Sequence, residues 1–101
     1  MGLNTALEAA LTGLGIAKSS GANLADSTLN TVAAIPAGAT GVDIVVVSGQ
    51  IFWTNDGSAA TANSFLLDTG QVLKVRNSAA LLAVIHLFAS AAYDIRLAWW
   101  K

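Results

Sequence analysis

The chain has 101 residues, of which 54% are hydrophobic and only 11% are charged, and it contains no cysteine. This length predicts one domain, because domain sizes peak near about 100–150 residues. Its five Lys and Arg residues are scattered among six acids, for a net charge of −1. Nucleic acid is therefore not an expected partner, since it is bound by clustered cations.

The first predicted element is an amphipathic helix over residues 3–17. Its leucines (Leu3, Leu7, Leu11 and Leu14) share one helical face, and alanines of high helix propensity lie between them. The following KSSGANLADS has no period and is rich in small polar residues, which predicts a connector. We therefore expect residues 1–28 to form a helix and connector arm, whose leucine stripe either docks on a partner or packs on the rest of the same chain.

From residue 29 onward the pattern changes to short strands between turns. The segments IPAGATG, NDG and DTG contain the Pro, Gly, Asn and Asp residues that favour turns. Strand-like stretches lie between and after them, namely VDIVVVS, QIFWT, SFLL, QVLKV, LLAVIHLFA and YDIRLAWW. Residues 29–101 are predicted to form a mainly β domain, an antiparallel β-sandwich or jelly roll of six or seven strands.

Two of these strands are apolar on both faces. In IVVV (44–47) and LLAVIHLF (81–88), apolar residues occupy both phases of the alternation, whereas the outer face of a two-sheet domain is normally polar. Other subunits or the amino-terminal helix must then cover the second face. The expectation is a homo-oligomer, specifically a trimer.

The chain ends in YDIRLAWWK, with two adjacent tryptophans. Tyr93, Ile95, Leu97 and Trp99 share one phase of a strand, so Trp99 is predicted to lie in the core. Trp100 has the opposite phase. It either caps the edge of a sheet or anchors a partner, as tryptophan often does in interfaces.

Catalytic and metal-binding patterns are not expected. The only histidine, His86, lies in an apolar stretch and is interpreted as a hydrogen-bonded sheet residue. The scattered aspartates match neither a metal-ligand spacing nor an acid/base pair. The longest uncharged apolar stretch, residues 79–93, is 15 residues long, whereas a membrane-spanning helix needs about 18 or more. We expect no enzymatic activity, no cofactor, no metal and no membrane segment.

The series IPAGATGVDIVVVSGQIFWTNDGSAATANSFLLDTGQVLKV, followed by an aromatic final strand, resembles a class of small virion proteins of tailed bacteriophages. In that class a strand follows an IPAGA turn, and a Trp-containing strand precedes an Asp-Gly hairpin. A Thr-Ala-rich segment then leads to a second turn ending in Thr-Gly. The resemblance covers residues 32–100 and implies a β-sandwich component of the phage head.

What the resemblance implies is a non-enzymatic capsid cement or decoration protein, or the base of a head fibre, at the capsid surface. Its partners would be further copies of itself and the major capsid protein or another virion protein. The candidate interface residues are Leu3, Leu7, Leu11, Leu14, Trp53 and Trp100. One alternative is a tail, baseplate or neck component. Another is a carbohydrate-binding module in which Trp53, Trp99 or Trp100 stacks on sugar rings.

Overall fold

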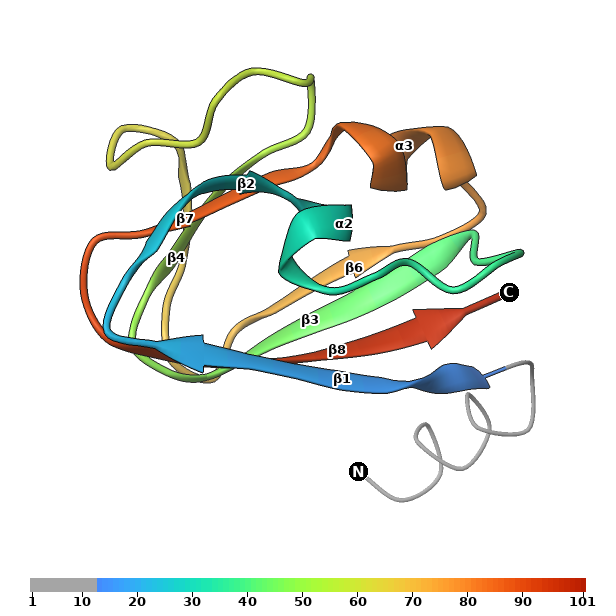
Figure 1. Cartoon of the computed structure of the whole chain (residues 1–101), viewed down its shortest axis with the longest axis horizontal. Helices are drawn as coiled ribbons and strands as arrows, with labels where there is room; N and C mark the ends of the chain where they lie inside the picture. The colour runs from blue at the N-terminus through green and yellow to red at the C-terminus, as the bar shows by residue number, and fades with distance from the viewer. Residues whose placement is uncertain (1–12) are drawn as a thin grey trace.

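The computed structural model describes residues 13–101, which form eight strands and two short helices (Figure 1). This confirms the predicted mainly β class. The helices are α2 (Leu29–Val32) and α3 (Ala79–Val84). The strands are β1 (Gly13–Gly21), β2 (Leu24–Thr28), β3 (Gly41–Ser48), β4 (Ile51–Thr54), β5 (Phe65–Leu67), β6 (Val72–Val75), β7 (His86–Ala89) and β8 (Tyr93–Trp100).

The strands form two four-stranded antiparallel sheets. Sheet A has the order β1-β8-β3-β6, and sheet B has the order β2-β7-β4-β5. The pairs β1–β8, β2–β7, β3–β6 and β4–β5 match the first half of the chain to its second half in reverse order. The pairs β3–β8 and β4–β7 join these ribbons side by side. The topology is therefore a long two-stranded ribbon wound into two layers.

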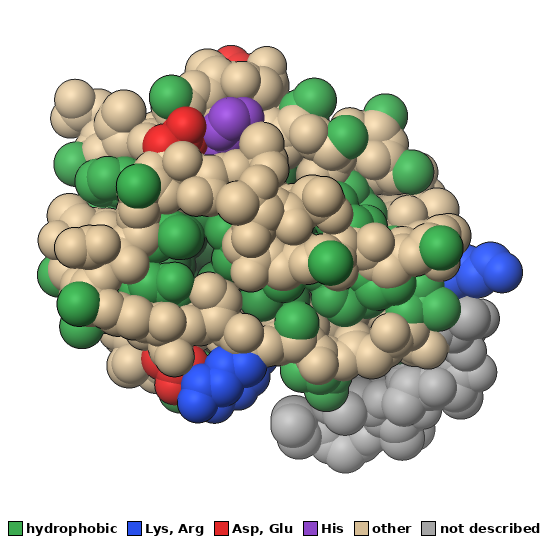
Figure 2. Space-filling view, in the orientation of Figure 1, with side chains coloured by type: hydrophobic (Ala, Val, Ile, Leu, Met, Phe, Trp, Pro, Cys, Tyr) green, Lys and Arg blue, Asp and Glu red, His purple; other side chains and the backbone are tan. Residues whose placement is uncertain are grey.

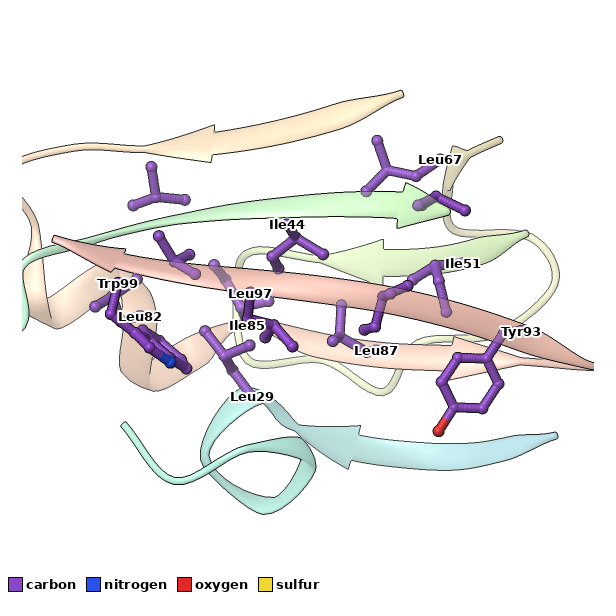
Figure 3. Close-up of a cluster of buried hydrophobic side chains, with 14 of the residues drawn as sticks. Leu29, Ile44, Ile51, Leu67, Leu82, Ile85, Leu87, Tyr93, Leu97 and Trp99 are labelled. Carbon is purple, nitrogen blue, oxygen red and sulfur yellow. The ribbon is translucent and has the colours of Figure 1, made fainter. Parts of the chain in front are cut away.

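The two sheets share one apolar core. On β8, side chains alternate between buried and half-buried, and Tyr93, Ile95, Leu97 and Trp99 all point inward, as predicted. Figure 3 shows Ile44 and Leu97 of sheet A facing Leu87 of sheet B across this core. The remaining large buried residues are Leu29, Val42, Val46, Ile51, Leu67, Val75, Leu82 and Ile85. Both helices contribute to this core.

The predicted turns are confirmed by backbone geometry. Gly38, Gly57 and Gly70 lie in the three predicted turn segments, and each has a positive φ. Gly49, between β3 and β4, has a φ of +82°, and a Cβ atom there would lie 2.3 Å from the carbonyl oxygen of Ala92. Only glycine fits at this position, because both the backbone conformation and the space exclude a side chain.

Residues 13–28 differ from the predicted arm. Residues 13–17, placed in the helix, and KSSGANLADS, placed in a connector, form β1 and β2 instead. β1 pairs with β8 from Gly13 opposite Trp100 to Gly21 opposite Tyr93. The predicted domain boundary at residue 28 is thus wrong for residues 13–28, which belong to the two sheets. These strands are stabilised by pairing partners that are distant in sequence. The rest of the predicted helix lies outside the described residues.

The predicted strand LLAVIHLFA is also wrong in its first half. Residues 79–84 form α3, whose first turn is capped by Ser78 Oγ, which accepts a hydrogen bond of 3.1 Å from the Leu81 amide. Only His86–Ala89 is a strand. Of the two segments predicted to be strands apolar on both faces, β3 is a strand throughout, with Val47 45% exposed on the outer side. The strand half of the second segment, β7, also carries apolar residues on both faces. The apolar outward residues behind the expectation of a covered second face therefore lie on β3 and β7.

Candidate interaction surfaces

The structure separates the predicted interface residues. Trp53 lies on β4 in sheet B, where it is half-buried against the core, and Trp100 lies on β8 in sheet A. Leu14 lies on β1 and packs against the core from the edge of sheet A. Leu3, Leu7 and Leu11 lie outside the described residues. Trp53 and Trp100 therefore do not form one site.

Trp100 is held on the outer face of sheet A by a polar cluster. Its Nε1 donates a hydrogen bond of 3.2 Å to Asp43 Oδ2. Arg76 donates to both carboxylate oxygens of Asp43, at 2.6 and 3.2 Å, and its guanidinium lies 5.4 Å from the centroid of the Trp100 ring. A bidentate carboxylate pair combined with a cation–π contact orients both side chains. Trp100 is thus a fixed, half-buried ring on an exposed face.

The outer face of sheet A carries most of the charge of the molecule. Lys18, Asp43, Lys74, Asp94 and Arg96 occupy outward positions on its four strands, in neighbouring cross-strand rows. Arg96 pairs with Asp94 on the same strand. Exposed apolar side chains lie among these charges, with Ile16 76% exposed on β1 and Val72 41% exposed on β6.

The outer face of sheet B is aromatic. Phe88, Phe52 and Leu66 are register partners on β7, β4 and β5 and point away from the core. The two phenylalanine rings lie 6.2 Å apart, and Leu66 is 45% exposed. We call these three residues the phenylalanine face. Solvated outer faces of antiparallel sheets are normally polar, so this row is a candidate interaction surface.

The third phenylalanine, Phe65, lies at the β5 edge beside this face. Its ring lies 4.9 Å from that of Trp53 and is 61% exposed. No phenylalanine of the sequence is therefore part of the buried core. This edge extends the apolar surface of sheet B toward solvent.

A polar row lies next to the phenylalanine face. His86 is the register partner of Thr54 and of Thr28, and its Nδ1 lies 2.9 Å from Asp26 Oδ1. A hydrogen bond from the backbone amide of Ala60, at 2.8 Å, together with His86, holds the pKa of Asp26 below its ordinary value. His86 is thus a hydrogen-bonded sheet residue, as predicted.

Across residues 13–101, no three His, Cys, Asp or Glu side chains are placed to hold a metal ion together. In the same residues, no helix is long and apolar enough to cross a membrane. Comparison of the chain with protein-family models, curated proteins and solved structures found no match.

Sequence reasoning missed the phenylalanine face and the cluster around Trp100. Phe52 alternates with Ile51 and Trp53, so its outward phase was present in the sequence. Its alignment with Phe88 and Leu66 depends on strand pairing, which local patterns do not specify. The contact of Asp43 with Arg76 similarly joins residues 33 positions apart.

Proposed function

We propose that this chain is a non-enzymatic structural protein of a tailed-phage virion, a cement or decoration subunit that binds the capsid exterior as a homo-oligomer. The observation that carries the proposal is the winding of its strands. Eight strands in two sheets, paired first to last, are the arrangement expected of a jelly roll, an architecture recurrent in viral capsid proteins. The sequence resemblance over residues 32–100 supplies the virion context.

The surfaces of the two sheets support a binding role. Both outer faces carry exposed apolar side chains, among them Leu66 on sheet B and Ile16 on sheet A. Trp100 is held ready for contact by Asp43 and Arg76, which lowers the entropy lost when a partner covers it. A particle-bound subunit would bury these side chains.

The carbohydrate-binding alternative has less support, although lectins also use jelly rolls. Trp99 is only 3% exposed, and Trp53 packs against the core and Phe65. Trp100 is half-buried and its indole nitrogen is already bonded to Asp43. A sugar platform needs an accessible ring with free polar groups around it.

The test is the location of the protein in purified particles. Particles induced from the organism that carries the gene are purified on a density gradient, assayed for this chain by mass spectrometry, and labelled with gold-conjugated antibody. Labelling of heads supports the proposal. Labelling of tails or necks replaces it with the tail, baseplate or neck alternative, and absence from the particles overturns both.

A further inference from the structure

β1 forms one edge of sheet A. The strand order is β1-β8-β3-β6, so β1 pairs with β8 on one side and with no strand of the described residues on the other. Within residues 13–101, no backbone hydrogen bond joins that second side of β1 to another segment. In an antiparallel pair, alternate residues direct their N–H and C=O groups away from the partner strand. Every second residue of β1 therefore presents backbone groups that could pair with a further strand.

The other edge strands of the two sheets are shorter. β5 and β6 have three and four residues, and β2 has five, with a register shift between Leu24 and Ser27. Short or irregular edge strands are a common protection against association. β1 has nine residues, and its register with β8 is regular over Ile16–Gly21. β1 is therefore the edge best suited to accept another strand.

The side chains along this edge permit the close approach of a second strand. Lys18 is the one charged residue of β1, and Ile16 is apolar and 76% exposed. Figure 2 shows uncharged and hydrophobic atoms along most of the described part of the lower side of the molecule, where Figure 1 places β1. The remaining side chains of the regular part are small, namely those of Ala17, Ser19 and Ser20.

We infer that two copies of this chain associate through their β1 strands, which pair antiparallel across a two-fold axis and join the two copies of sheet A into one continuous sheet. A second copy of β1 is the occupant because it is itself an extended strand whose backbone groups lack a partner on the same side. A two-fold contact is self-complementary, so each strand satisfies the other. Such a contact gives a dimer, not the trimer expected from the sequence.

The charge of Lys18 limits the register of this pairing. Across a two-fold axis, one residue of β1 lies opposite its own copy. If that residue were Lys18, like charges would lie directly opposite each other, which is destabilising. The axis therefore passes beside Ala17 or beside Ser19, which are the register partners of buried residues of β8. Lys18 then lies opposite Ile16 of the second copy in the first register, or opposite Ser20 in the second.

The test uses variants of opposite charge at the two positions that can face Lys18. Ile16→Lys/Ser20→Lys places a lysine opposite Lys18 of the second copy in either register, whereas Ile16→Glu/Ser20→Glu places a carboxylate there. Ala59→Lys/Ala62→Lys adds the same positive charge at exposed positions between β4 and β5, outside both sheets. Sedimentation velocity measures association, and far-ultraviolet circular dichroism verifies that every variant is folded.

The wild type is expected to form a dimer as its concentration is raised. Ile16→Lys/Ser20→Lys should weaken the dimer by about tenfold or more, since like charges then lie directly opposite each other. Ile16→Glu/Ser20→Glu should associate at least as tightly as the wild type, because each Lys18 then faces an acid. Ala59→Lys/Ala62→Lys should associate like the wild type, which separates the effect of position from that of net charge.

Amide hydrogen exchange, followed by nuclear magnetic resonance, locates the interface in the wild type. Amides of Ile16–Gly21 that bond to β8 are protected in the monomer and in the dimer. The alternate amides, which point away from β8, should exchange about tenfold or more slowly in the dimer than in the monomer, because pairing protects them. Dilution of the wild type, or the Ile16→Lys/Ser20→Lys change, should restore their fast exchange.

A wild type that is monomeric at every concentration overturns the inference. A dimer whose alternate β1 amides stay in fast exchange also overturns it, as does an Ile16→Lys/Ser20→Lys variant that dimerises like the wild type, and both results would assign association to another surface. The interface rests on the self-association included in the proposed function and not on a place in the virion. A β1 dimer that is absent from virus particles would reject the phage assignment and keep the interface.

Discussion

The two terminal tryptophans offer a direct test of the sheet phase, because they are adjacent in sequence and point to opposite sides of sheet A. Trp99 is 3% exposed in the core, opposite Val42 in the register. Removing such a ring costs about 3–5 kcal/mol of unfolding free energy. With about 4–8 °C of melting temperature per kcal/mol for a domain of this size, Trp99→Ala should melt at least about 12 °C below the wild type.

Trp100→Ala is expected to lose less unfolding free energy than Trp99→Ala. It removes the hydrogen bond to Asp43 and the cation–π contact with Arg76, both on a partly exposed face. At exposed sites a cation–π contact contributes about 0.5–1 kcal/mol and a hydrogen bond about 0.5–1.5 kcal/mol, so the expected total is about 1–2.5 kcal/mol. Trp100→Phe keeps a ring under Arg76 and should cost less still.

Urea unfolding followed by circular dichroism measures these costs without relying on tryptophan fluorescence. The ratio of the two alanine costs is the informative quantity. Equal costs, or a larger cost for Trp100→Ala, would refute the assignment of Trp99 to the core and of Trp100 to the outer face.

The backbone at Gly49, the β1 strand and the Asp26 contacts can each be tested by a single change. Gly49→Ala should destabilise the protein by clearly more than Gly57→Ala in urea unfolding. Both changes place a side chain on a residue with positive φ, which costs about 1–2 kcal/mol. Only at Gly49 do backbone atoms also lie where the Cβ would be. Equal costs of the two changes would contradict this difference. Deleting residues 1–12 should leave the β-type circular dichroism spectrum intact, whereas deleting residues 1–20 removes most of β1 and should abolish cooperative melting. Because the folded pKa of Asp26 is lowered, its contribution to stability is present above the unfolded value of about 3.9 and is lost as the pH falls through the folded value. As the pH is lowered below about 4, the melting temperature of Asp26→Ala should therefore fall less than that of the wild type. An equal fall in the two proteins would contradict the Asp26 contacts.

Local chemistry was sufficient to predict the hairpin turns and the inward phase of β8. Turn residues act through their own backbone preferences, as at Gly57 and Gly70, and alternation depends only on strand geometry. The strand YDIRLAWW was therefore predictable from its own residues. β3 was also predictable as a strand, but apolar residues on both of its phases did not indicate which phase points inward.

Strand pairing was not predictable in this way. β1 is stabilised by β8, more than 70 positions away, and its leucine spacing continues that of the predicted helix. The stretch LLAVIHLFA illustrates the ambiguity of short apolar runs, which occur in buried helices and in strands alike. Here Ser78 caps a helical turn at the Leu81 amide, and the helix ends before His86 begins β7. The phenylalanine face depends on register and was missed for the same reason.

A density map of the intact particle, at a resolution that separates β-sheets, would test the proposed function most directly. We expect copies of an eight-stranded, two-sheet subunit on the outside of the head. A map in which the head surface lacks this subunit would contradict the proposed function.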